Sequence, residues 1–472
     1  MEARKAEAED RTNAGAPPGI EERINLLNKR LARYVPPRET WTPAEEALFK
    51  PIDLYRVPVD EAQAMQLKAI KYTFTRHYAH NDFYHRLCDM RGITPDDLRT
   101  YDDLDIIPLI PDLTFKQHPS GADFAHWIAN IYTGDLPTVV PLDITSNPTF
   151  DDVINAYNAA GLLVAYSSGT SGRHTVIPRD MRTYLTTQYS VGKQVCAMSD
   201  EIFADHTLLT MPRPTDGNLW IAKVLAHIYD MFSDLHYAMD YTISADLTLK
   251  AMTESERQGG SPASFEERMR RTAEIATKWL ERYEKTTDSI RLEGAPFFIA
   301  KLMDTLEREG KHFEFGERGT IRTGGGWKIS EDTRIPHADF RRRVEEVLGI
   351  PEARCHDVYA MIEITGIITT CPEGHYYHLP YTWVKPLVLD KSLMPVGYGE
   401  SGRFAFLDSL AGSYPGFIIT GDQVRMLEHC PACDRPGPVL EPEIQRAPSV
   451  EMRGCAEEVR RILAQDYVEA KK

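Results

Sequence analysis

A short apolar run that stops at a loop of serines and glycines constrains the fold most strongly. Residues 162–166 are followed at once by Ser167, Ser168, Gly169, Thr170, Ser171 and Gly172. An apolar run of this length, bounded by turn residues, is typical of a buried strand that ends in a tight loop. Similar runs occur at 208–211, 404–407 and 417–419. Because helical stretches lie between them, the sequence predicts an α/β fold.

Helical periodicity predicts where the helices lie. It is clearest over 264–283, where Ser264 and Glu267 match a capping box and one face is apolar, at Phe265, Met269, Ala273, Ala276 and Leu280. Residues 43–91 share the helical spacing. We therefore expect a helical opening region to about residue 150 and an α/β core after it.

Composition and charge bound the class of protein. The chain has 472 residues, of which 42% are hydrophobic, enough for a large core. Its formal charge of −16 does not favour nucleic acid as a partner. No stretch approaches the roughly 18 apolar residues of a membrane helix, and the first residues are charged where a secretory signal is apolar. The sequence therefore predicts a cytoplasmic protein without membrane attachment, and residues 1–20 read as a disordered tail.

Three motifs have the chemistry of a nucleotide site. The serine-glycine loop can turn amide and hydroxyl donors toward a polyphosphate, although it lacks the Gly-Lys ending of a P-loop. Glu363, in the segment YAMIEITG, can hold Mg²⁺. Asp422, in Thr420-Gly421-Asp422 at the expected end of the strand 417–419, can accept ribose hydroxyls. Taken singly, a surface turn and solvated acids are the alternatives.

The order and spacing of these motifs resemble the adenylate-forming superfamily over about residues 80–456. That superfamily includes acyl-CoA ligases and acyl-protein synthetases. The segments FY at 83–84 and GITP at 92–95 look like the phenylacetate-CoA-ligase-like branch. The segment TGGGWK at 323–328 looks like the acyl-protein synthetases of the bacterial luciferase system.

This resemblance implies a set of site residues. Residues 167–172 would wrap the β- and γ-phosphates of ATP, and Glu363 would ligate Mg²⁺. Asp422 would hold the ribose, with Arg446 as a hinge arginine near ribose and phosphate. The adenine wall would be formed by Gly324, Gly325, Gly326 and Tyr359.

One residue departs from the superfamily pattern, and two cations are further candidates for the site. The superfamily usually has threonine just before the glutamate, but here that position is Ile362, so the hydroxyl contact to the α-phosphate is missing or comes from another group such as Thr365. Lys328 and Arg173 are candidate cations for the reaction, with a solvated surface charge as the alternative.

The carboxyl-terminal end distinguishes the two branches. A typical CoA ligase has a small domain after the hinge, but only 26 residues follow Arg446 in this 472-residue chain. We therefore expect one adenylate-forming domain over 21–445, followed by a short segment, 446–472, as a truncated or vestigial carboxyl-terminal domain. In acyl-protein synthetases an Arg-Gly-Cys accepts the acyl group, and Cys455 lies in such a triplet. A structural cysteine at a helix start is the alternative.

The other cysteines suggest a metal. Cys430 and Cys433 form a C-x2-C pair, and Cys371 with His375 supplies two further ligands for a closed, structural zinc site. His378 or His429 is an alternative to His375. A coincidental or redox-active pair is the other interpretation.

The leading hypothesis is an acid–thiol ligase that uses ATP and Mg²⁺ to convert a carboxylic acid, taken to be a fatty acid, into acyl-AMP. It then passes the acyl group to Cys455 for an acyl reductase partner. The alternative within the superfamily is a phenylacetate-type ligase with coenzyme A as acceptor. A non-catalytic nucleotide-binding scaffold is the alternative of another class. The sequence leaves open which acid is activated and the oligomeric state.

Overall fold

The computed structural model describes residues 19–136, 148–167, 174–211, 213–214, 217–239, 263–327 and 334–447. The expected helical opening region and the expected helix at 264–283 are both present. The helices run in chain order as α2 Ile20–Arg30, α3 Pro43–Phe49, α4 Val59–His80, α5 Asp82–Arg91, α6 Ala122–Ile131, α7 Phe150–Ala159, α8 Met181–Met198, α9 Trp220–Val224, α10 Ile228–Met231, α12 Ala263–Tyr283, α13 Pro296–Arg308 and α14 His337–Leu348.

A 13-stranded mixed sheet runs through the molecule, in the order β11-β12-β13-β14-β10-β9-β8-β7-β6-β4-β5, with β1 and β15 both pairing with β13. A separate two-stranded sheet joins β2 to β3. The bounds are β1 Ile110–Pro111, β2 Leu163–Tyr166, β3 Val176–Arg179, β4 His206–Leu209, β5 Leu235–Tyr237, β6 Ile290–Gly294, β7 Gly319–Gly324, β8 Cys355–Tyr359, β9 Ile368–Thr370, β10 Tyr377–His378, β11 Val384–Leu389, β12 Ser401–Asp408, β13 Phe417–Leu427, β14 Val439–Leu440 and β15 Gln445–Arg446.

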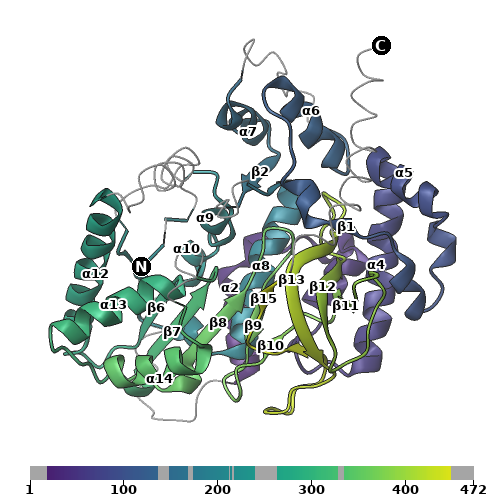
Figure 1. The fold of residues 1–472 in the computed structure, drawn as a ribbon. Helices are drawn as coiled ribbons and strands as arrows, with labels where there is room; N and C mark the ends of the chain where they lie inside the picture. The colour runs from purple at the N-terminus through teal and green to yellow at the C-terminus, as the bar shows by residue number, and fades with distance from the viewer. Residues whose placement is uncertain are drawn as a thin grey trace.

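The parallel part of the sheet, β5-β4-β6-β7-β8, lies beside α12, α13 and α14 (Figure 1). Its apolar side chains join those helices in one core, which includes Leu208, Leu292 and Ile321. A buried ion-pair network crosses the same strands: Glu201 accepts from Arg291 Nε at 2.8 Å and from Arg322 Nε at 2.6 Å. Each charge has an opposite partner, so the burial of these charges is compensated.

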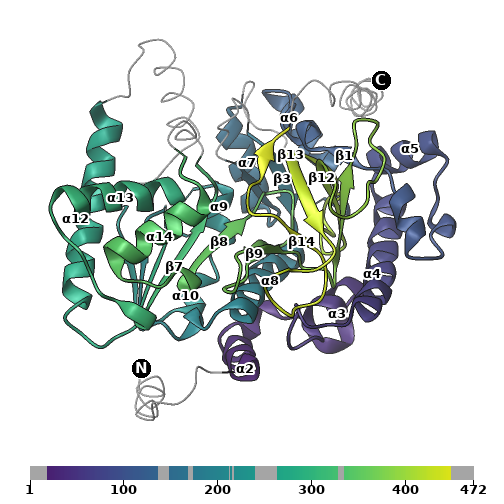
Figure 2. The same cartoon turned by 60° about the horizontal axis from the view of Figure 1, so that its bottom comes forward.

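The antiparallel part, from β9 to β14, packs against the opening helices. Gln66 of α4 is buried and donates to the carbonyl of Val384 in β11, at 2.6 Å. Figure 2 shows α3 and α4 on the side of the molecule away from α12 and α13. Helix α8 begins with Asp180 as its N-cap, which accepts from the Thr183 amide at 2.7 Å, and it packs against β9 and α2.

The predicted strands are confirmed, with one correction. The run 162–166 contains β2, and 208–211, 404–407 and 417–419 overlap β4, β12 and β13. However, Thr420-Gly421-Asp422 does not follow the end of its strand, because β13 continues to Leu427. The continuation is stabilised by pairing with β14 and β15, which come later in the chain. Within the part of the chain that the structure describes, no helix is long and apolar enough to cross a membrane.

Candidate adenylation site

The segment Thr420-Gly421-Asp422 forms an irregularity in the middle of the sheet. The register between β12 and β13 shifts between Arg403 and Ala405, opposite these three residues. Thr420 Oγ1 donates to the Phe404 carbonyl at 2.9 Å and accepts from the Asp422 amide at 3.1 Å. Such bulges re-aim side chains at functional sites. Asp422 therefore has a fixed position although it is not at a strand end.

Asp422 joins two other predicted residues. The Tyr359 hydroxyl, at the end of β8, donates to Asp422 Oδ2 at 2.6 Å. Arg446 Nη1, on β15, lies 2.8 Å from Asp422 Oδ1. Burial and the nearby Asp422 charge raise the pKa of Tyr359 well above its usual value, so its hydroxyl stays protonated and remains a donor. Three residues that are far apart in the sequence thus form one connected group.

The predicted glycines lie beside this group. Gly324 ends β7 and pairs with Val358, the residue before Tyr359. Gly325 and Gly326 have φ values of 81° and 66°, a left-handed conformation that favours glycine, and both are exposed. An open backbone surface beside the end of β8, where Tyr359 lies, suits a flat ring such as adenine.

Glu363 lies in the turn after β8 and is buried, with 5% of its surface exposed. Burial raises the pKa of Glu363, and the positive charge of Lys116 offsets this rise only in part. Lys116 Nζ lies 2.6 Å from Asp112 Oδ2. Burial alone would lower the pKa of Lys116, but attraction to Asp112 and Glu363 outweighs it and the pKa is raised. Lys116 is therefore a charged lysine in the electrostatic field of the glutamate.

Lys116 and Asp112 were missed by the sequence analysis. The short strand β1 pairs in parallel with β13, with Pro111 opposite Ile419, and this brings Asp112 next to the Thr-Gly-Asp segment. An added Cβ at Gly421 would lie 3.5 Å from Asp112 Oδ2 and 3.6 Å from Arg446 Nη1. The four-residue spacing of Asp112 and Lys116 could have suggested an ion pair, but nothing local indicated its partner strand.

The predicted phosphate loop is described only at its base. Ser167 pairs with Thr175 across the β2–β3 hairpin, through bonds of 2.9 Å in both directions. The hydroxyl of Thr175 in turn helps to lower the pKa of Glu363. The base of the loop is therefore next to the glutamate. Ser168, Gly169, Thr170, Ser171 and Gly172 lie outside the described residues, as do Arg173, Lys328 and Cys455.

The structure also describes Ile362, the residue before the glutamate. Ile362 is buried, and its carbonyl, not its side chain, is in a polar contact, with Arg179. Thr365 is fully buried, and its amide donates to Asp408 Oδ2 at 2.5 Å. This burial does not favour Thr365 as the replacement hydroxyl for an α-phosphate. No other described residue is assigned to that contact.

Four candidate metal ligands form a second group, separate from Tyr359, Asp422 and Arg446. The ligand atoms of Cys371, His378, Cys430 and Cys433 all lie within 4.8 Å of one another. Cys371 Sγ is 4.0 Å from Cys430 Sγ, and Cys433 Sγ is 3.5 Å from His378 Nε2.

The histidine of this group is His378, not His375 as expected first. Residue 375 belongs to the turn that separates Cys371 from β10 and has a φ of 57°. Its side chain lines a small cavity with His356 and Asp357 instead. His429 is exposed and is not in the group either.

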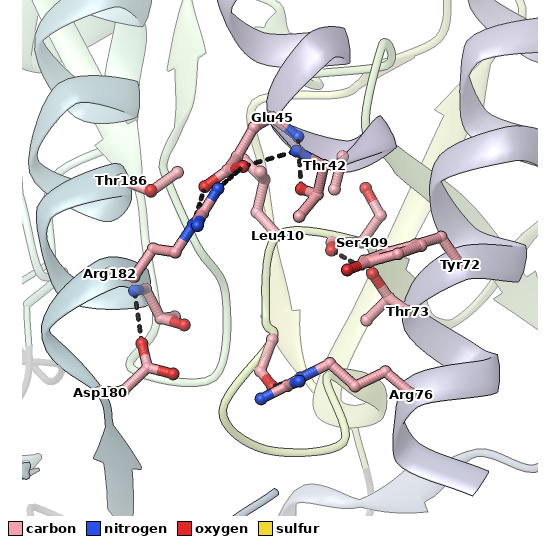
Figure 3. A pocket seen from close by; sticks show the side chains of 13 residues that line it. Thr42, Glu45, Tyr72, Thr73, Arg76, Asp180, Arg182, Thr186, Ser409 and Leu410 are labelled. Atoms are coloured by element: carbon pink, nitrogen blue, oxygen red, sulfur yellow. Dashed lines mark hydrogen bonds and ion pairs between the residues drawn. The ribbon is translucent and has the colours of Figure 1, made fainter. Parts of the chain in front are cut away.

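A separate pocket of about 170 Å³ lies between α3, α4 and α8 (Figure 3). Its charged lining includes Arg182, which lies 2.6 Å from Glu45 Oε2, and Arg76, whose Nε donates to the Gly412 carbonyl at 3.1 Å. None of the motif residues lines it. Because its cations already have protein partners, this pocket is a poor candidate for the nucleotide site.

Comparison with known proteins defines the class. The structure of 2-hydroxyisobutyryl-CoA ligase in an open conformation, with its acyl-adenylate and CoA, aligns with a TM-score of 0.55 at 14% identity, over 88% of this chain and 75% of that chain. A thioesterification-state structure of the same ligase aligns with a TM-score of 0.54 at 16% identity, over 88% of this chain and 72% of that chain. The fold is therefore that of the adenylate-forming ligases, as the motifs predicted.

Sequence comparison then gives the family. The acyl-protein synthetase family, LuxE, matches residues 162–464, and this chain belongs to it. The long-chain-fatty-acid–luciferin-component ligase of Vibrio harveyi is 26% identical over 405 residues, 84% of this chain and 88% of the relative. The protein of the same name from Aliivibrio fischeri is 25% identical over 404 residues, with the same coverage. The expectation of an acyl-protein synthetase, a ligase of the adenylate-forming superfamily, is confirmed.

Proposed function

We propose that this chain activates a long-chain fatty acid as acyl-AMP at the group formed by Tyr359, Glu363, Asp422 and Arg446, and that it passes the acyl group to Cys455. The observation that carries the proposal is the convergence of these residues with Lys116 around Gly421. The names of the two bacterial relatives support a long-chain fatty acid as substrate.

The ribose would be held by Asp422. Each carboxylate oxygen can accept two hydrogen bonds, and Tyr359 and Arg446 occupy one site on each oxygen. One acceptor site on each oxygen is left for the two ribose hydroxyls. The adenine would lie against Tyr359 and the glycines 324–326.

The first step joins two anions, so charge must be neutralised. An oxygen of the fatty carboxylate attacks the α-phosphorus, the bond from that phosphorus to the bridging oxygen breaks, and pyrophosphate leaves. Lys116 and Arg446 supply positive charge beside the reacting groups, and residues 167–172 would hold the departing pyrophosphate. Glu363 offers the hard oxygen ligand that Mg²⁺ prefers, and the ion would neutralise phosphate charge when bound.

The second step transfers the acyl group. The Cys455 thiolate attacks the acyl carbonyl carbon, the bond from that carbon to the phosphate oxygen breaks, and AMP leaves. The thioester is the form in which an acyl reductase partner would receive the acyl group. The domain organisation that we propose fits this sequence of steps, with the adenylate formed by 21–445 and the acceptor carried on 446–472.

Pyrophosphate exchange tests the proposal. With Mg²⁺ and a long-chain fatty acid, labelled pyrophosphate should enter ATP, and it should not do so when the acid is omitted. In Cys455→Ser the exchange should persist, whereas hydroxylamine-sensitive labelling of the protein by radioactive acid should disappear. Exchange without labelling of either the wild type or the variant, together with acyl-CoA formed in the presence of coenzyme A, would favour the CoA-ligase alternative. No exchange with fatty, aromatic or amino acids would favour the non-catalytic alternative.

We also propose that Cys371, His378, Cys430 and Cys433 bind a structural zinc ion. Tetrahedral bond lengths of 2.3 Å to sulfur and about 2.05 Å to nitrogen place sulfurs about 3.8 Å apart, and sulfur about 3.6 Å from nitrogen. The corresponding separations are 4.0 and 3.5 Å. Four protein ligands leave no open position, so the ion would join the turn after β9 to the turn after β13 and would not take part in catalysis.

The zinc proposal has a matched control three residues from the proposed histidine ligand. The purified protein should contain about one zinc per chain by elemental analysis. His378→Ala should lose most of it, whereas His375→Ala should retain it, because His375 is outside the ligand group. Equal zinc contents in the two variants, or none in the native protein, would contradict the assignment.

A further inference from the structure

The backbone that carries Glu363 is held by three side chains from outside its own segment. Arg179, at the end of β3, donates through Nη2 to the Ile362 carbonyl. The Tyr414 hydroxyl donates to the Glu363 carbonyl at 3.0 Å. Asp408, at the end of β12, accepts from the Thr365 amide at 2.5 Å through Oδ2. Three of the four consecutive residues 362–365 are therefore fixed through their main chain.

The three holding side chains are themselves fixed. All are fully buried. Arg179 Nη2 also lies 3.2 Å from the Tyr414 hydroxyl, and the guanidinium stacks 3.9 Å over the ring of Trp220. Asp408 Oδ1 accepts from the amide of Leu410 at 2.9 Å. Buried hydrogen bonds of this kind hold their side chains in place, because a shift would leave a buried polar group without its partner.

Residues 361–366 need such support because they form neither a helix nor a strand. In a turn of this kind, no ladder of backbone hydrogen bonds sets the direction of the side chain. A ligand for Mg²⁺ must nevertheless be placed closely, because the ion requires near-ideal octahedral geometry. Small shifts of Glu363 would therefore weaken metal binding before they unfold the protein.

We propose that Arg179, Asp408 and Tyr414 are positioning residues that hold the backbone of residues 362–365 so that the Glu363 carboxylate meets the magnesium nucleotide. This proposal rests on the proposed function, since it assumes that Glu363 binds that ion. None of the three side chains touches substrate; each acts through the main chain of the glutamate turn.

Two mild variants test the proposal, with one matched control. Tyr414→Phe removes only the hydroxyl, and Asp408→Asn keeps the shape of the side chain but only one acceptor oxygen. Tyr157→Phe is the control: Tyr157 is also buried, and its hydroxyl donates to the Ala125 carbonyl at 2.7 Å, away from the glutamate turn. The readouts are the apparent Mg²⁺ constant of pyrophosphate exchange and the hydrogen–deuterium exchange of a peptide that covers residues 360–367.

In Tyr414→Phe and Asp408→Asn the apparent Mg²⁺ constant should rise by about three- to tenfold, the effect of one lost hydrogen bond. Saturating Mg²⁺ should restore most of the rate, and the glutamate peptide should exchange faster. Tyr157→Phe should change the Mg²⁺ constant less than twofold despite a similar loss of stability. Equal Mg²⁺ constants in all three variants, with a normally active wild type, would refute the positioning role alone. A wild type without any exchange activity would instead refute the proposed function, and the positioning role with it.

Discussion

Asp422→Asn isolates the role of one carboxylate in nucleotide binding. In the native site Oδ2 accepts from Tyr359 at 2.6 Å and Oδ1 pairs with Arg446 at 2.8 Å, which leaves one free acceptor site on each oxygen. Asparagine has a single, neutral acceptor oxygen, so it can accept only two of these four bonds and cannot bind both ribose hydroxyls as well as Tyr359 and Arg446. A hydrogen bond to a charged group contributes about 1.5–3 kcal/mol. The KM for ATP should therefore rise about 10- to 150-fold.

The assay is pyrophosphate exchange at varied ATP with saturating acid and Mg²⁺. The rate at saturating ATP should fall less than the KM rises, because the ribose bonds form before the reaction and persist through it. Asp205→Asn is the control: Asp205 also accepts two bonds, both from Ser289, but it precedes β4 at the opposite end of the strands. An unchanged KM in Asp422→Asn, or an equal rise in Asp205→Asn, would refute the ribose assignment.

Three further predictions concern charge and packing. Lys116→Met should move the acid limb of the pH profile of kcat/KM to higher pH, because the Lys116 charge lowers the pKa of Glu363, which must be ionised to bind metal. Lys116→Arg keeps the charge and should leave the limb in place, so an unmoved limb in both variants would contradict the coupling. Gly374→Ala would place a Cβ 2.1 Å from that of Ala432, between the two cysteine turns. It should lower the free energy of unfolding in urea by about 1–3 kcal/mol and reduce the zinc content. Gly397→Ala should do neither, because the nearest neighbour of its added Cβ is 3.7 Å away. Glu201→Gln should lower the free energy of unfolding by about 3–5 kcal/mol, because it leaves Arg291 and Arg322 buried with their shared carboxylate removed. Glu307→Gln, which breaks an exposed pair with Arg343, should lower it by less than about 1 kcal/mol. Similar losses in the two variants would show that the buried network is not what stabilises these strands.

Sequence patterns predicted the features that depend on residues close together in the chain. The apolar face of 264–283 gave a helix within one residue of α12, since burial of such a face stabilises the helix. The run before Ser167 is a strand that ends at the serine-glycine segment, because apolar residues followed by glycines leave little else. Tyr359 and Asp422 were predicted as site residues from motif order, and they are hydrogen-bonded in the structure.

Features set by distant pairing could not be predicted. The position of Asp422 within β13 depends on β14 and β15, and the approach of Asp112 and Lys116 depends on β1 pairing with a strand about three hundred residues later. The same holds for the metal ligands, where spacing alone does not distinguish His375 from His378; pairing of β10 with β9 and β14 selects the latter. Arg179 and Asp408 were not singled out because a charged residue at a strand end has no local sign of burial.

The central claim is that the acid is activated as an acyl-adenylate, and oxygen transfer measures this directly. When a fatty acid labelled with ¹⁸O in its carboxylate is supplied with ATP and Mg²⁺, and the acyl group is released with hydroxylamine, mass spectrometry should find one ¹⁸O in AMP for each acyl group transferred. Label in inorganic phosphate, with ADP as the other product, would show that an acyl phosphate is formed instead and would contradict the account.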